Sequence, residues 1–167
     1  GPPVLNAAQF AHAARLLAAI VDATAPADRQ MDRHFRANPR LGARDRGLIA
    51  ETVYACLRRL GLPRHLVGAP GPAEAWLAVH LLREGLSARA LEQLRYRGKD
   101  SLAPPALAAS LRTLDPAALP RHARLDLPGW LLARLDAQLG VEETEALAAA
   151  LQQPAPLDLR VNTLKAD

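Results

Sequence analysis

The sequence predicts an all-α fold for most of the chain, followed by a short strand-like segment. Ala and Leu recur up to Gln153, and both residues are strong helix formers. Half of the 167 residues are hydrophobic but only 4% are aromatic, so small aliphatic side chains must fill the core. The pattern changes after Pro154-Ala-Pro156. Leu157, Leu159 and Val161 then alternate with polar residues, as in a half-buried strand.

The first three helices are predicted from apolar residues at helical spacing. Their expected ranges are Asn6–Thr24, Pro26–Ala37 and Ala43–Leu60. Asn38-Pro39 should end the second helix, because the residue before a proline disfavours helical geometry. The third helix has the clearest apolar stripe, formed by Ile49, Val53, Cys56 and Leu60. We therefore expect it to be the central buried helix and to stop at Gly61.

The second half should hold further helices beyond a turn-rich break at residues 68–72. Their expected ranges are Ala73–Arg83, Ser87–Tyr96, Pro105–Leu114, Pro128–Leu139 and Val141–Gln153. We expect residues 1–2 to be the remnant of a cleaved expression tag and residues 3–126 to form one helical domain. Residues 127–153 should form C-terminal helices that connect this domain to another subdomain, which begins at residues 154–167. Because a lone strand cannot bury its face, the natural protein is expected to continue past Asp167.

Basic charge is concentrated in the first part of the chain. Residues 1–64 carry ten arginines against five acidic residues, whereas residues 126–167 carry three basic residues against seven acidic ones. Nearly all of the basic residues are arginines, whose planar guanidinium groups suit phosphate. The distribution indicates a body that faces a polyanion, although a GC-rich genome would also favour arginine over lysine.

Few residues offer catalytic chemistry. Cys56 lies on the apolar stripe of the third predicted helix, where a cysteine usually acts as a small hydrophobe. No CxxC or HExxH spacing predicts a metal site, and no glycine-rich loop after a strand predicts a cofactor pocket. The apolar runs are too short to cross a bilayer, and a single cysteine favours the cytoplasm. We expect no membrane contact, no catalytic residue and no cofactor in this part of the protein.

The remaining candidate is a nucleic-acid-binding surface. Several arginines surround the junction between the second and third predicted helices, and a second basic patch flanks Tyr96. Tyr96 could stack on a base or be a core residue. The alternative interpretation is that Arg44 and Arg46 pair with acids such as Asp45 or Glu51. The predicted RNA-binding residues are Arg33, Arg36, Arg40, Arg44, Arg46, Arg58, Arg59, Arg64, Arg95, Arg97, Lys99 and Arg160.

Three segments resemble a known family. Residues 41–60, with the sequence LGARDRGLIAETVYACLRRL, resemble the signature helix of NusB-like domains. Leu127-Pro-Gly-Trp-Leu131 and Leu159-Arg-Val-Asn-Thr-Leu164 are similar to segments that follow such a domain in bacterial rRNA cytosine-C5 methyltransferases of the Sun/Fmu (RsmB) type. Family members usually place Ser or Thr before the signature helix, where this chain has Gly42.

The resemblance implies a NusB-like helical bundle followed by a small RNA-recognition subdomain. It also implies a separate domain of the full-length enzyme that binds S-adenosylmethionine and carries two catalytic cysteines, whose motifs are absent here. This chain would then be a non-catalytic module that positions rRNA and contacts its own catalytic domain. The alternative is a helical protein-interaction module, as in NusB-dependent transcription antitermination, that docks on a ribosomal protein or on the catalytic domain. A free-standing enzyme that uses Cys56 is the least favoured hypothesis.

Overall fold

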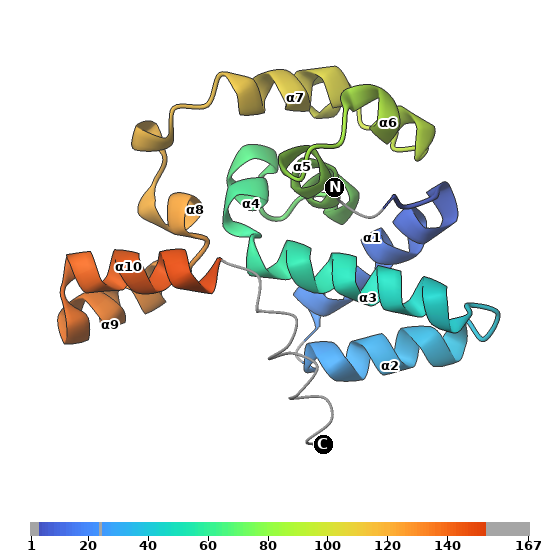
Figure 1. Cartoon of the computed structure of the whole chain (residues 1–167), viewed down its shortest axis with the longest axis horizontal. Helices are drawn as coiled ribbons and strands as arrows, with labels where there is room; N and C mark the ends of the chain where they lie inside the picture. Colours follow the sequence, from blue (N-terminus) through green and yellow to red (C-terminus); the bar gives the residue numbers. More distant parts are fainter. Residues whose placement is uncertain (1–3, 24, 153–167) are drawn as a thin grey trace.

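A computed structural model describes residues 4–23 and 25–152, and these residues fold into helices joined by turns (Figure 1). The all-α prediction is confirmed for them, whereas the strand expected from Leu157 lies outside the described residues. The elements in chain order are α1 (Ala7–Asp22), α2 (Ala27–Ala37), α3 (Ala43–Arg58), α4 (Gly61–Val67), α5 (Ala73–Arg83), α6 (Ala88–Gln93), η1 (Asp100–Leu102), α7 (Pro104–Arg112), η2 (Pro116–Ala118), α8 (Arg121–Leu125), α9 (Gly129–Leu139) and α10 (Val141–Leu151).

The central helix is α5 rather than α3, so that sequence prediction was wrong. Every residue from Ala75 to Leu81 is buried. Figure 1 shows α5 in the middle of an arc formed by α1, α3, α4, α6 and α7. By contrast, α3 buries one stripe that includes Ile49, Val53 and Cys56. A stripe marks a helix that is half exposed, whereas a helix buried on all sides shows no such pattern.

The first helix fixes the start of α3. Asn6 and Gln9 form a capping box at the beginning of α1, with both side-chain-to-backbone hydrogen bonds at 2.8 Å. The amide of Gln9 also donates to Asp45 at 2.7 Å. Because α1 packs along α3 and α5 through buried residues such as Leu16 and Leu17, the entry to α3 is held in a defined position.

Helix α2 folds back beside α3. Tyr54 of α3 donates a hydrogen bond to Asp28 near the start of α2. On the other side, His34 of α2 contacts His12 of α1, with 3.0 Å between their ring nitrogens. Burial is the main cause of a lowered pKa in both histidines, so neutral rings are favoured at this contact.

Helix α4 was missed by the sequence analysis. The third helix ends at Arg58, and Gly61, which was expected to stop it, instead begins α4. A Cβ atom on Gly61 would lie 2.6 Å from the carbonyl oxygen of His122, so glycine allows α8 to pack directly against α4. Pro63 does not disturb α4 because it lies in the first turn, where its missing N–H has no helical partner.

The last three helices form a small unit on α4. Leu125, Leu132 and Ala148 make a separate hydrophobic cluster, and α8 contacts both this cluster and α4. Arg121 reinforces the unit through ion pairs with Asp136 at 2.6 Å and Glu145 at 3.4 Å. None of the helices in residues 4–152 that the structure describes is long and apolar enough to cross a membrane.

Candidate nucleic-acid interface

Four of the predicted RNA-binding arginines are exposed at the corner between α2 and α3, and we call Arg33, Arg36, Arg40 and Arg44 the corner arginines. Two lie on α2, one lies in the connecting loop and one lies in the first turn of α3. Their side chains make no hydrogen bond or ion pair with any other described residue. Their guanidinium groups are therefore available to an external anion, and this geometry suits phosphate oxygens.

The sequence prediction did not include Arg29 among the RNA-binding residues. Arg29 is exposed and precedes Arg33 and Arg36 at i, i+4 and i+7 on α2, so the three side chains share one face of the helix. The opposite face carries the buried residues Gln30 and Met31. The signal that could have identified Arg29 was this helical spacing.

Arg46 has a different environment from the corner arginines. Its Nε donates to the carbonyl oxygen of Leu41 at 2.7 Å, and one terminal nitrogen lies 3.5 Å from the carbonyl oxygen of Phe35. Its guanidinium also lies 5.5 Å from the centroid of the Phe35 ring. Arg46 therefore connects the end of α2 to the start of α3 and helps to shape the corner.

Two acidic residues, Asp45 in the first turn of α3 and Asp28 at the start of α2, are occupied by other partners, whereas Asp32 on α2 is exposed and has no described partner. Asp45 accepts from Gln9, and Asp28 accepts from Tyr54. The bond to Asp28 is the main cause that raises the pKa of Tyr54 to about 12. No ion pair joins Arg44 to Asp45 or Glu51 within the described residues, so the corner keeps its positive charge.

The predicted residues at the far end of α3 occupy three environments. Arg58 is exposed, whereas Arg59 lies 3.6 Å from Glu84 in an ion pair. Arg64 on α4 lies over Trp76, with its guanidinium carbon 5.6 Å from the ring centroid. These residues are separated from the corner arginines by the length of α3, so the structure does not bring the whole predicted set together (Figure 1).

The second basic patch lies beyond α6, across the molecule from α2 (Figure 1). Arg95, Arg97 and Lys99 are exposed there. Tyr96 is only 2% exposed and donates to the carbonyl oxygen of Leu102 at 2.7 Å. Tyr96 is therefore a core residue, and the stacking role that the sequence left open does not fit. Arg160 lies outside the described residues.

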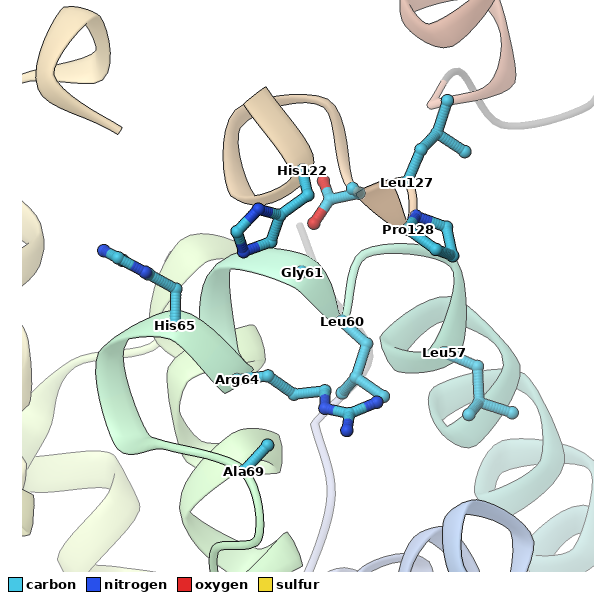
Figure 2. Close-up of a pocket in the computed structure, with 10 residues that line it drawn as sticks. Leu57, Leu60, Gly61, Arg64, His65, Ala69, His122, Leu127 and Pro128 are labelled. Carbon is cyan, nitrogen blue, oxygen red and sulfur yellow. The ribbon is translucent and has the colours of Figure 1, made fainter. Parts of the chain in front are cut away.

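A groove of about 570 Å³ lies where α3, α4 and α8 meet (Figure 2). Leu57 and Leu60 line it from α3 and the turn that follows, and Arg64 and His65 line it from α4. His122 closes the side formed by α8. The groove combines apolar surface with side chains that carry nitrogen donors.

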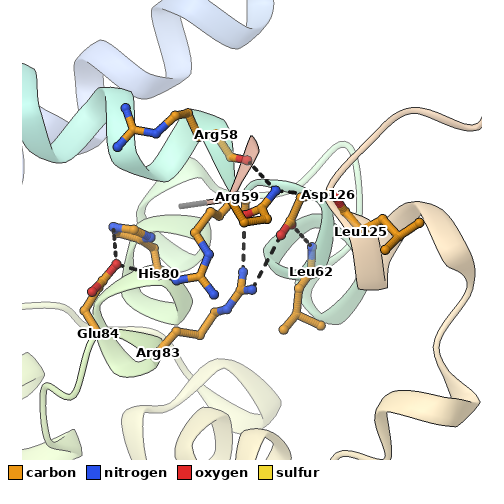
Figure 3. Close-up of polar contacts among 9 residues, drawn as sticks. Arg58, Arg59, Leu62, His80, Arg83, Glu84, Leu125 and Asp126 are labelled. Carbon is orange, nitrogen blue, oxygen red and sulfur yellow. Dashed lines mark hydrogen bonds and ion pairs between the residues drawn. The ribbon is translucent and has the colours of Figure 1, made fainter. Parts of the chain in front are cut away.

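Buried polar groups stabilise the junction behind the groove. The Asp126 side chain is 2% exposed and lies 3.6 Å from Arg83, and Figure 3 shows the surrounding contacts. His80, also buried, lies 3.9 Å from Glu84, and its Nδ1 has no hydrogen-bond partner among the described residues. Burial, followed by the charges of nearby arginines, lowers the pKa of His80 to about 4. A neutral His80 therefore suits this arginine-rich environment.

Cys56 is fully buried, and burial raises the pKa of its thiol to about 12. Such a thiol is a poor nucleophile near neutral pH. Within the part of the chain that the structure describes, no three His, Cys, Asp or Glu residues gather in a group that could hold a metal ion.

The hairpin of α9 and α10 exposes several large apolar side chains. Trp130 is the largest of them and is 67% exposed. The others on these two helices are Leu139, Val141, Leu147 and Leu151. Exposed apolar side chains mark a protein contact where they form a continuous patch, and those of α9 and α10 are the candidates for such a patch in the described structure.

Comparison with known proteins gives one family match. Residues 127–167 match the family model described as "Methyltr_RsmF/B-like, ferredoxin-like domain". The match indicates a methyltransferase of the RsmB/RsmF type, as the sequence resemblance predicted. It leaves residues 3–126 uncovered, so their likeness to NusB stays a prediction. No curated protein and no solved structure matches the chain.

Proposed function

Because residues 127–167 match the model of the RsmF/B-like ferredoxin-like domain, we propose that the preceding helices form a NusB-like module of an rRNA cytosine-C5 methyltransferase. The module binds rRNA and positions it for methylation by another region of the enzyme. We assign no chemical step to its residues.

The observation that carries this proposal is the set of corner arginines. They are exposed, close in sequence around one turn, and without acidic partners among the described residues. Each guanidinium that neutralises an RNA phosphate releases condensed counterions. The corner therefore supplies affinity for an RNA backbone without requiring a particular base sequence.

Arg46 supports the same surface indirectly. It donates to two backbone carbonyl groups around the α2–α3 turn, which fixes the direction in which α3 leaves the loop. The position of Arg44 depends on that direction, because Arg44 lies in the first turn of α3. We therefore assign Arg46 to positioning and Arg44 to RNA contact.

The family implies S-adenosylmethionine as the methyl donor of the whole enzyme. In Rossmann-type domains, adenosine-containing cofactors bind outside the carboxyl ends of the strands, beside a glycine-rich turn between a strand and a helix. Residues 4–23 and 25–152 contain no such strand and turn, so they do not fit the cofactor. S-adenosylmethionine has no role in the RNA contacts proposed for these residues.

Binding of a labelled small-subunit rRNA hairpin tests the proposal. The variant Arg40→Glu/Arg44→Glu should lose most of the affinity, whereas the control Arg89→Glu/Arg112→Glu, with the same change in charge at exposed sites on α6 and α7, should lose little. Circular dichroism should show both variants to be as helical as the original chain. Equal losses in the two variants would mean that only net charge matters, and no binding by any protein would reject the RNA role.

A protein-docking function is the second candidate, and the exposed apolar side chains of α9 and α10 favour it. The partner would be a ribosomal protein or the catalytic domain of the same enzyme. Trp130 is exposed whereas Trp76 is buried, so a blue shift of tryptophan emission on mixing would report coverage of Trp130. Docking without RNA binding would favour this second function.

A further inference from the structure

The groove between α3, α4 and α8 has the size and lining of a small ligand site. Its volume of about 570 Å³ falls within the range of roughly 300–1,000 Å³ found for such sites. Its apolar lining residues are Leu57, Leu60, Ala69, Leu127 and Pro128. Figure 2 shows the His122 ring above α4 and the Arg64 side chain on the other side of Gly61.

The walls of the groove are held in place by direct backbone packing. Gly61 lets α4 approach α8 so closely that an added Cβ would lie 3.0 Å from the Cα of Asp126. Asp126 also accepts from the backbone N–H of Leu62 at 3.3 Å. The residues on the two helices therefore keep a fixed separation, which lowers the entropic cost of binding a ligand between them.

The accessible face of the groove favours an anion. Among the described residues that line the groove, Asp126 is the only acidic one, and its side chain is 2% exposed and paired with Arg83. Arg64, His65 and His122 are exposed, and no acidic residue forms an ion pair with Arg64 within the described chain. A ligand that enters would meet donor groups rather than a carboxylate.

The donor side chains are also flat. The His65 and His122 rings lie 6.4 Å apart, centroid to centroid, at an interplanar angle of 77°. Unpaired RNA bases stack on imidazole rings and on guanidinium planes, and phosphate groups accept hydrogen bonds from the same side chains. An apolar floor beside these groups suits the face of a base.

From these observations we infer that the groove binds an unpaired nucleotide of the rRNA, with the base against the apolar floor and His122 and the phosphate near Arg64. The inference rests on the proposed RNA-binding function. The groove lies at the opposite end of α3 from the corner arginines, and this helix of 16 residues is about 24 Å long. A strand held at the corner would reach the groove beside Leu127, where the family match begins.

Two RNAs distinguish this site from the corner surface. One is a fully paired hairpin, and the other is the same hairpin with a single-stranded tail that contains 2-aminopurine. The original chain should bind the tailed RNA about tenfold more tightly, because stacking of one base gives an effect of this size, and 2-aminopurine fluorescence should fall as the base stacks. His65→Ala/His122→Ala and Arg64→Gln should remove the advantage of the tail but retain binding of the paired hairpin.

The variants at the corner should show the converse behaviour. Arg40→Glu/Arg44→Glu should weaken binding of both RNAs by a similar factor, and Arg89→Gln should serve as the control for Arg64→Gln. Equal affinity of the original chain for the two RNAs, or a tail advantage that survives the His65→Ala/His122→Ala change, would overturn the nucleotide site alone. If neither RNA binds, both the site and the proposed function are overturned.

Discussion

The carboxylate of Asp126 lies 3.6 Å from the guanidinium of Arg83, and both side chains are largely buried. Asp126 has a left-handed backbone conformation, with φ of 57°, and it also accepts from the N–H of Leu62 (Figure 3). The residue directly before the family-matched segment is thereby joined to α4 and α5. This pair fixes the direction in which the chain leaves the helical body.

Replacement of Asp126 by Ala should destabilise the chain by roughly 3 kcal/mol, because it leaves the buried charge of Arg83 without its partner. Asp100→Ala is a matched control, since Asp100 also has a positive φ, of 55°, but is exposed and forms no ion pair in the described structure. Urea unfolding of the two variants measures the difference. Similar losses of unfolding free energy would mean that the Asp126–Arg83 pair contributes little.

Protonation of His80 should lower the free energy of unfolding as the pH decreases. Its pKa in the folded chain is about 4, below the usual 6.5, so the unfolded chain takes up the proton first as the pH falls. The contribution is complete above pH 6.5 and declines between pH 6.5 and pH 4. His80 should account for a loss of about 2 kcal/mol between pH 7.5 and pH 5. Urea unfolding at both pH values should show a smaller decline in His80→Gln, and an identical decline would contradict the assignment.

Cys56 should resist modification in the folded chain. Burial and a thiol pKa raised to about 12 leave very little reactive thiolate at pH 8. A thiol reagent should label the protein in urea at once but label the native protein only as fast as it unfolds. Cys56→Ala should retain RNA binding, and rapid labelling without unfolding would show that the site is open.

Substitutions of Arg46 and Arg44 should differ in their effects on stability and on RNA binding. Arg46→Gln removes the charged donor to Leu41, which should lower the unfolding free energy by about 1–2 kcal/mol. Arg44→Gln changes an exposed side chain without a described partner and should leave stability unchanged but weaken RNA binding. Thermal unfolding and RNA titration of both variants check the assignment, which fails if Arg44→Gln destabilises the chain as much as Arg46→Gln does.

The sequence predicted the helical class and most helix ranges because α1, α2 and α3 each have one exposed face. The same criterion misplaced the centre of the core. Since α5 is buried on all sides, its apolar residues show no stripe, and α3 seemed the more regular helix. Helix α4 was not predicted because it is only seven residues long and begins at a glycine that the sequence pattern assigned to the end of a helix.

The candidate interface was predictable as a region but not residue by residue. Charge density pointed to residues 33–64, yet nothing in the spacing separated Arg46, bonded to carbonyl groups, from Arg44. Likewise, the ion pair of Arg59 with Glu84 and the contact of Arg64 with Trp76 depend on α5. These partners are distant in sequence, so only the packed structure reveals them.

The most direct test of the account is the dependence of RNA affinity on salt for the original chain and for Arg40→Gln/Arg44→Gln. Loss of two phosphate contacts should reduce the slope of log K against log salt concentration by roughly 1.5. Arg89→Gln/Arg112→Gln, with the same loss of charge at exposed sites elsewhere, should leave the slope nearly unchanged. The same slope for all three proteins would show that the corner arginines do not contact the RNA backbone.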